Sequence, residues 1–239
     1  MATRSNRADL FASERRFFLV MALAIAGTVI FGFGLDFWRF DGLFFSLPFH
    51  VHLHGAVFTA WILFYVLQNW LVASGSVALH RRIGMLGGVV AVMMVVLGIT
   101  TTVWAIEMHR VPPFFSPGLF LALDVLGILG FGVLTAWAIA LRRQADWHKR
   151  LMLCGTVLVM SPALGRILPM PLLGPFGPLA VFVAMSVYVL VGMAYDIRRR
   201  GRVHPAYWWG GGVLVVTQVL VGPVGFSAPV LRLAEQLAA

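Results

Sequence analysis

Seven long apolar stretches dominate this sequence. They cover residues 17–34, 51–74, 84–105, 117–141, 151–168, 177–195 and 207–226, counted approximately. A helix needs about 20 apolar residues to cross the hydrocarbon core of a bilayer, and only helices and closed barrels satisfy their backbone polar groups there. None of the stretches alternates between apolar and polar residues as a barrel strand does. The sequence therefore predicts an all-α integral membrane protein with seven transmembrane helices.

The composition supports a membrane location for nearly the whole chain. Hydrophobic residues make up 60% of the sequence and charged residues only 11%, whereas a soluble domain is about half apolar and a quarter charged. The net charge of +9 does not indicate nucleic-acid binding, because the basic residues lie in short clusters between apolar stretches. The lipid bilayer is thus the expected partner. We expect a membrane domain over 17–226, between a cytoplasmic tail at 1–16 and a short outer tail at 227–239.

The distribution of lysine and arginine predicts the orientation. If the N-terminus is cytoplasmic, 14 of the 18 basic residues fall in inner segments, and the outer segments hold Arg39, Arg110, Arg166 and Arg232. Cytoplasmic loops carry an excess of basic residues. The sequence therefore predicts the N-terminus inside and the C-terminus outside.

An internal repeat links the second and fourth loops between spans. "LHRRIGMLGGVV" at 79–90 matches "WHKRLMLCGTVL" at 147–158 with a constant offset, and both contain a basic pair after a histidine and a shared glycine. Membrane proteins are often built from duplicated hairpins. We therefore expect spans two to five to form a central four-helix bundle from two copies of a helical hairpin, with spans one, six and seven packed outside it.

A few polar side chains interrupt the spans, and such residues usually face the bundle interior. His54, Trp61 and Gln68 are seven apart and share one helical face. Asp124 in span four and Arg166 in span five fall at the same outer depth as His54. One hypothesis is an outer pocket of these five residues, covered by residues 36–49 and open to the outside. The alternative is that Asp124 and Arg166 only neutralise each other and join two helices.

Two groups of histidines are candidate ligands. His50, His52 and His54 form an HxHxH segment that could hold copper or zinc, but no Cys, Asp or Glu lies close by to complete a tetrahedral site. His80 and His148 occupy equivalent repeat positions on the inner side. Two neutral imidazoles can be the axial ligands of a b-type haem, and the nearby Arg82 and Arg150 would suit its propionates. The alternative is that both are interfacial loop histidines.

Three segments carry a resemblance to a known family: "HGAVFTAWILFYVLQNWLVASGSVALHRRIG", "DWHKRLML" and "RGRVHPAYWWG". They resemble an uncharacterised family of bacterial multi-span membrane proteins, which implies the bacterial inner (cytoplasmic) membrane. The pattern positions implied are His54, Trp61, Gln68, His80, Arg82, His148, Arg150 and His204. More distantly, the layout is similar to ascorbate-reducible transmembrane cytochromes b, which bind two haems through four histidines. Span four here has no histidine, so the resemblance allows one haem at most.

Three functions remain open on this basis. The first is a membrane oxidoreductase or electron carrier with one b-type haem, whose partner is a quinone or another redox protein. The second is a non-redox membrane protein that binds a small polar or ionic ligand in the outer pocket. The third is a metal-dependent membrane enzyme that uses the HxHxH segment. No Walker, Rossmann or hydrolase-elbow motif is present.

Overall fold

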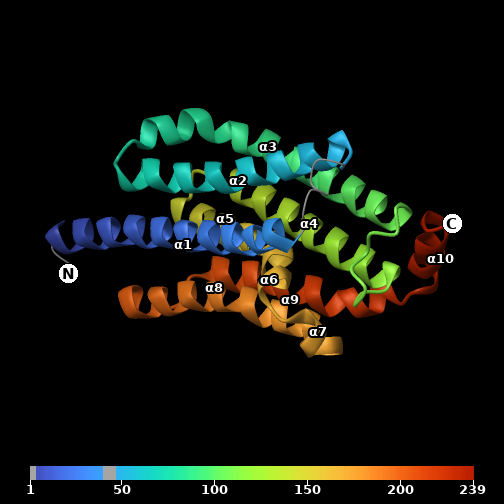
Figure 1. Cartoon of the computed structure of the whole chain (residues 1–239). Helices are drawn as coiled ribbons and strands as arrows, with labels where there is room; N and C mark the ends of the chain where they lie inside the picture. The colour runs from blue at the N-terminus through green and yellow to red at the C-terminus, as the bar shows by residue number, and fades with distance from the viewer. Residues whose placement is uncertain (1–3, 40–46) are drawn as a thin grey trace.

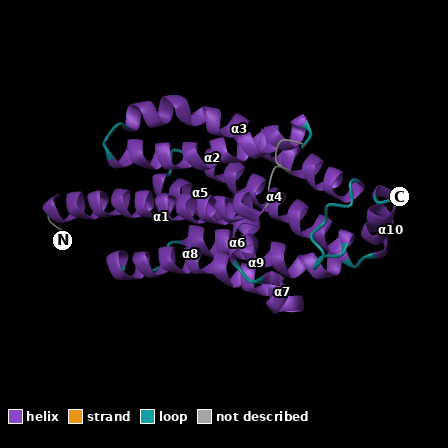
Figure 2. Ribbon diagram, in the orientation of Figure 1, coloured by secondary structure: helices purple, strands orange, loops and turns teal. Residues whose placement is uncertain are grey.

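The computed structural model describes residues 4–39 and 47–239, and these residues form helices joined by short connections (Figures 1 and 2). The helices are α1 (Arg4–Arg39), α2 (Phe49–Ala73), α3 (Val77–Glu107), α4 (Pro117–Ala140), α5 (Ala145–Leu158), α6 (Ser161–Ile167), α7 (Met170–Leu173), the 3₁₀ turn η2 (Gly174–Phe176), α8 (Gly177–Arg200), α9 (Pro205–Gly225) and α10 (Ala228–Leu237). The expectation of an all-helical chain is confirmed for the part of the chain that the structure describes.

The long helices have the length and hydropathy of membrane spans. Six helical stretches among the described residues are long and apolar enough to cross a bilayer, and the bent pair α5–α6 passes the same test when its two halves are taken together. The chain is therefore a multi-pass membrane protein. The start of α1 and the last helix, α10, lie at opposite ends of the bundle (Figure 1).

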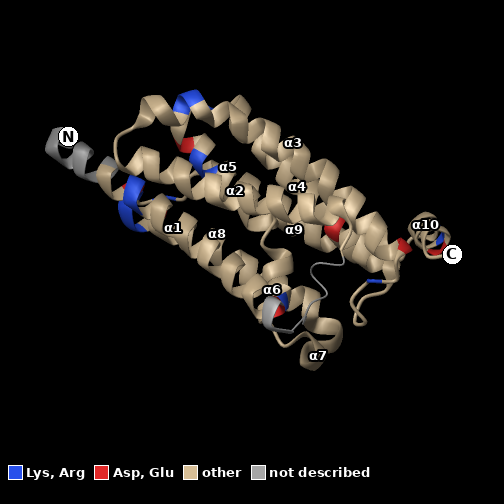
Figure 3. Ribbon diagram, turned by 45° about the horizontal axis from the view of Figure 1, so that its top comes forward, with Lys and Arg blue, Asp and Glu red and all other residues tan. Residues whose placement is uncertain are grey.

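Charge distinguishes the two ends of the bundle. One end carries the connections at 74–76, 141–144 and 201–204, and most of the lysine and arginine residues that the structure describes lie there (Figure 3). We call this the basic end and the other the opposite end. The separation in space follows the clustering in sequence, because short connections keep each cluster beside the helix ends that flank it.

The centre of the bundle differs from the prediction. α4 packs against α3, α5 and α9, and α9 also packs against α5. The last span, expected outside a bundle of spans two to five, is therefore part of the centre. α3 lies at the periphery and exposes Met85, Leu86 and Val89 along its outer face. The physical reason lies in the glycines of α9, since small residues allow two helix backbones to approach closely in lipid. Gly210 of α9, for example, packs on Cys154 of α5.

The two repeat segments take equivalent positions. His80 is the fourth residue of α3 and His148 is the fourth residue of α5. The shared glycines both pack on the preceding helix of their own hairpin: Gly87 faces Phe64 of α2, and Gly155 faces Leu134 of α4. These contacts are what two copies of one helical hairpin would produce.

The fifth span is broken in its middle. α5 and α6 meet at an angle of 49° across Val159 and Met160. Pro162 stands in the first turn of α6, where it has no backbone N–H to continue the α5 hydrogen-bond ladder. The bend directs α6 against α1, and Gly32 lies directly on the backbone of Ala163. This contact fixes the position of α6.

The contact between α1 and α6 predicts that alanine substitutions at two glycines of α1 change the free energy of unfolding in opposite directions. A Cβ at Gly32 would overlap the carbonyl of Ala163, which is backbone and cannot rotate away, whereas a Cβ at Gly27 would meet nothing within 4 Å. We expect Gly32→Ala to lower the free energy of unfolding by about 1–3 kcal/mol through overpacking. Gly27→Ala should raise it by up to about 1 kcal/mol, because alanine is the better helix former. Thermal unfolding of both variants in one detergent measures the difference, and equal shifts would contradict the contact.

The chain after the last long helix contains a further element. Residues 227–239 were expected to be a short tail, but 228–237 form α10, which packs on α4 with Ala234 buried. α10 lies across the opposite end of the bundle (Figure 1).

Candidate functional site

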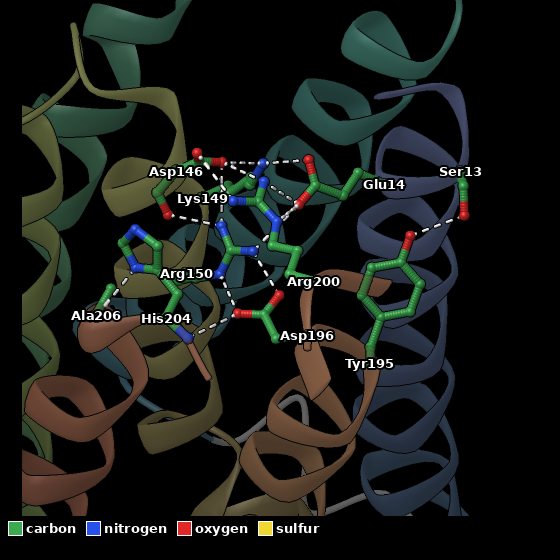
Figure 4. A network of polar contacts seen from close by, with 10 residues as sticks. All are labelled: Ser13, Glu14, Asp146, Lys149, Arg150, Tyr195, Asp196, Arg200, His204 and Ala206. Atoms are coloured by element: carbon green, nitrogen blue, oxygen red, sulfur yellow. Dashed lines mark hydrogen bonds and ion pairs between the residues drawn. The ribbon is translucent and has the colours of Figure 1, made fainter. Parts of the chain in front are cut away.

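A network of charged side chains lies just inside the basic end (Figure 4). It joins four helices through Glu14 of α1, Asp146, Lys149 and Arg150 of α5, Asp196 and Arg200 of α8, and His204 at the start of α9. Three carboxylates face three basic side chains, so the six charges balance. Charges removed from water require such partners.

Arg150 is the centre of the network. Its side chain is 0% exposed, and its Nε donates to Asp196 Oδ2 at 2.9 Å. One terminal nitrogen donates to Glu14 Oε1 at 3.1 Å, and the other donates to the backbone oxygen of Asp146 at 3.0 Å and to its carboxylate at 3.2 Å. The planar guanidinium therefore connects α1, α5 and α8 at one point, which the single-point charge of a lysine could not reproduce.

The remaining members complete the same set of contacts. Glu14 also receives Lys149 Nζ at 2.8 Å and Arg200 at 2.6 Å, while Arg200 reaches Asp146 at 2.8 Å. The backbone N–H of His204 donates to Asp196 at 3.1 Å. The network therefore also fixes the turn between α8 and α9.

His204 caps the next helix. Its Nδ1 accepts a hydrogen bond from the backbone N–H of Ala206 at 3.2 Å. This acceptor role requires an imidazole without a proton on Nδ1. Burial, and after it the positive charge of Arg150, lowers the pKa of His204 below its usual value. The hydrogen bond and the lowered pKa both indicate a neutral histidine at neutral pH. His204, one of the positions implied by the family resemblance, therefore has a structural role as a helix cap.

The network changes the interpretation of several residues. Arg150 was expected to hold a haem propionate, but its guanidinium is fully occupied by protein acceptors. Glu14, Asp146 and Asp196 were not recognised as important in the sequence. Their rarity and position in the sequence could have indicated them. The chain has only nine acidic residues, and each of these three stands where an apolar stretch meets a basic cluster.

His80 and His148 form the second feature of the basic end. Their rings lie 6.2 Å apart between centroids at an interplanar angle of 73°. His148 Nδ1 is 2.8 Å from the backbone oxygen of Ala138 in α4, which fixes its ring. His80 Nδ1 is buried and makes no hydrogen bond of normal geometry with the described residues. The two histidines at equivalent repeat positions thus lie beside each other, although they come from separate helices.

Other polar groups lie along the face of α2 that the sequence predicted to point inward. Trp61 and Gln68 are both buried. The ring of Trp61 packs edge-on against Phe131 of α4, at 4.9 Å between centroids. Gln68 lies near the start of α3, where its Oε1 approaches Gly84. Gln68 is therefore beside the His80 end of the bundle, and the predicted outer pocket does not include it.

The remaining pocket residues lie near the opposite end. His54 Nδ1 is 3.4 Å from the backbone oxygen of Leu97, and Asp124 accepts a hydrogen bond from the Thr102 hydroxyl at 3.3 Å. Arg166 pairs with Asp36 of α1, and its guanidinium lies over the ring of Phe33. Half of the cover predicted for this pocket, residues 40–46 of 36–49, lies outside the described residues.

The ion pair predicted between Asp124 and Arg166 is therefore wrong as a direct contact. Its physical cause is the break in the fifth span. Because Gly32 meets Ala163, the residues one turn further on, Asp36 and Arg166, face each other. The bend thus turns Arg166 toward α1, and Asp124 on α4 bonds to Thr102 of α3 instead.

This correction changes the expected effect of two substitutions. We expect Arg166→Gln to lower the free energy of unfolding by about 1–2 kcal/mol, because Asp36 loses its cation in a partly exposed site. Asp124→Asn should change it by less, since the amide oxygen still accepts from Thr102. The unfolding midpoints of the two variants test which substitution costs more stability. A larger loss for Asp124→Asn than for Arg166→Gln would contradict this assignment and favour the Asp124–Arg166 ion pair.

The HxHxH segment does not gather its three imidazoles. α2 begins at Phe49, so the segment is helical, and helical spacing places only His50 and His54 on one face. The ring of His50 packs edge-on against Trp104 at 5.3 Å, and that of His54 stacks on Phe58 at 4.1 Å. In the described part of the chain, no group of three or more His, Cys, Asp or Glu side chains could hold a metal ion. A metal centre of His50, His52 and His54 is not formed in this structure.

Comparison of the chain with protein-family models, curated proteins and solved structures gave no match.

Proposed function

We propose that this chain is a membrane redox protein that holds one b-type haem between His80 and His148. The observation that carries the proposal is the 6.2 Å separation of the two rings, which come from equivalent positions of a repeated hairpin. If the group is bound, the imidazoles of His80 and His148 would hold its iron, one from each copy of the repeated hairpin.

The surroundings of His148 support a role as an axial ligand. Metal-bound histidines usually donate their other ring N–H to a carbonyl or carboxylate, which fixes the tautomer and the ring orientation. The Nδ1 contact of His148 with the Ala138 oxygen supplies this arrangement and leaves Nε2 as the ligand atom. A porphyrin brings four nitrogens of its own, so two protein imidazoles are sufficient.

One predicted propionate partner remains available. Arg82 is exposed two residues after His80, and an arginine pairs well with a carboxylate. Arg150 is excluded from this role by its contacts with Asp196 and Glu14. When bound, the haem would supply one-electron chemistry, while the protein would fix its position and shield it from water.

The orientation that we propose would put the haem near the cytoplasmic surface. We propose seven crossings in a bacterial inner membrane, with α5 and α6 as one broken span, and with the N-terminus inside because most basic residues gather at the basic end (Figure 3). A quinone in the bilayer or another redox protein would be the electron partner.

An absorption spectrum of the detergent-purified protein tests the function directly. We expect a Soret band that shifts on reduction with dithionite, with the sharp α-band of a low-spin haem. Protein that stays colourless after expression with ample haem precursor would overturn the proposal. Metal analysis of the same sample for iron, copper and zinc separates a haem from the alternative of a protein-bound copper or zinc ion.

A second candidate function is favoured by Asp124. This half-buried carboxyl lies within a span, and its hydrogen bond comes from Thr102 rather than from a cation. Ionisable residues inside spans commonly mark ligand or ion paths. Binding of a small cation near Asp124 and His54, measured by calorimetry on the colourless protein, would favour this function over the redox one.

A further inference from the structure

A groove lies between α1 and α8 near the basic end. Its lining contains no residue of the Arg150 network, of the His80–His148 pair or of the predicted outer pocket. It has a volume of about 290 Å³ and is lined by Phe17, Val191, Ala194, Tyr195 and Arg198. Its wall is apolar along Phe17, Val191 and Ala194, and the cation Arg198 lies toward the end of α8. The groove thus combines an apolar channel with a positive charge at one end.

Packing between the two helices holds the groove in shape. Phe17 of α1 stacks on Tyr195 of α8, with ring centroids 3.9 Å apart and an interplanar angle of 11°. The Tyr195 hydroxyl is 2.8 Å from Ser13 Oγ, and Arg199 donates to the same oxygen at 2.7 Å. One wall is therefore fixed by aromatic stacking and by two hydrogen bonds.

Arg198 differs from its neighbours in having no acceptor. Arg199 is bonded to Ser13, and Arg200 to Glu14 and Asp146. Arg198 is exposed and makes no ion pair or hydrogen bond within residues 12–36 and 47–239, whose side chains the structure describes. Among the side chains that the structure describes, the neighbouring acids Glu14 and Asp196 are buried in the Arg150 network. Within that part of the chain no acceptor occupies the Arg198 guanidinium, so it can bind an anion from outside the chain.

Position in the bilayer identifies the class of ligand. Arg198 stands where the apolar part of α8 ends, which is the depth of lipid headgroups, and Val191 is two turns deeper along the same helix. Arg15 and Arg16 at the same end are also exposed and add positive potential. Basic pockets between spans on the cytoplasmic side attract anionic lipid headgroups.

We propose that this groove binds an anionic phospholipid from the same leaflet. The phosphate would accept hydrogen bonds from Arg198, and one acyl chain would lie along Phe17, Ala194 and Val191. A guanidinium pairs with phosphate through two parallel hydrogen bonds. The apolar wall of the groove would contact the acyl chain in place of neighbouring lipid or detergent. The proposal does not depend on haem, since the groove lies between α1 and α8, whereas His80 and His148 belong to α3 and α5.

Native mass spectrometry of the full chain with defined lipids tests the proposal. With phosphatidylglycerol, we expect one lipid retained by the wild-type protein, and about fivefold to tenfold weaker retention by Arg198→Gln, the cost of one charged contact at a membrane surface. The matched control is Arg143→Gln, which removes an exposed arginine from the α4–α5 connection at the same end and should retain the lipid as the wild type does.

A second variant separates the groove from general charge attraction. Val191→Trp adds only apolar bulk to an exposed position in the groove, so it should fold and yet lose the lipid with Arg198 intact. Equal retention of phosphatidylcholine and phosphatidylglycerol by the wild type would overturn the proposal. Equal losses in Arg198→Gln and Arg143→Gln would also overturn it, as would full retention in Val191→Trp.

Discussion

Arg150→Gln is expected to lower the free energy of unfolding by about 3–5 kcal/mol, the range seen when one partner of a buried ion pair is removed. The guanidinium is 0% exposed and contacts two carboxylates that are themselves buried, Glu14 and Asp196. Glutamine is too short and too weak a donor to satisfy both. The substitution would leave negative charge in a region that water does not reach. Chemical denaturation in a mild detergent, or the loss of folded protein on heating, measures the effect.

Two further variants show whether the cost arises from orphaned charge. Arg143→Gln removes the same kind of side chain from an exposed position and should change stability by less than about 0.5 kcal/mol. The double variant Arg150→Met with Asp196→Asn removes a cation and an anion together, and it should recover part of the loss because fewer charges lack a partner. If Arg150→Gln unfolds at the wild-type midpoint, the network is not what joins α1, α5 and α8.

Much of the fold could be predicted because each span is a local property of the sequence. The apolar stretch at 84–105, for example, lies within α3 at Val77–Glu107, and the stretch at 117–141 matches α4 at Pro117–Ala140. The thickness of the hydrocarbon core sets the length of each apolar stretch and therefore of each helix. Pro162 was interpreted from the sequence as a break in the fifth span, but the bend that it introduces was not predicted. The reason is that a proline shows where a helix can break, while tertiary packing decides its angle.

Pairings between distant helices could not be predicted in the same way. Arg166 was assigned to Asp124 by depth alone, but depth does not say which neighbour a helix faces. The choice of Asp36 depends on the contact between Gly32 and Ala163, 131 positions apart in the sequence. The pairing of Arg150 with Glu14 and Asp196 joins three helices in the same way. By contrast, the approach of His80 to His148 could be anticipated, because the repeat placed both at the fourth residue of equivalent helices.

The second large effect concerns these two histidines and rests on the proposed haem. We expect His80→Ala and His148→Ala each to abolish the low-spin absorption spectrum of the purified protein. A bis-imidazole iron requires both ligands. The other histidine of the basic end, His204, packs on Trp147 and caps α9 through its Nδ1, and His50 and His54 lie near the opposite end. His52→Ala removes an imidazole near the opposite end of the bundle, and it should leave the spectrum unchanged.

Folding must be separated from ligation in this experiment. Neither His80 nor His148 belongs to the charged network around Arg150, so both variants should still fold. His148→Ala removes the contact with the Ala138 oxygen, and we expect it to cost about 0.5–1.5 kcal/mol, the usual net contribution of one hydrogen bond. A variant that unfolds near the wild-type midpoint of haem-free protein yet has no low-spin spectrum supports direct ligation. If either variant keeps the wild-type spectrum, the iron is held elsewhere, and the 6.2 Å approach of the two rings is only packing between the two halves of the repeat.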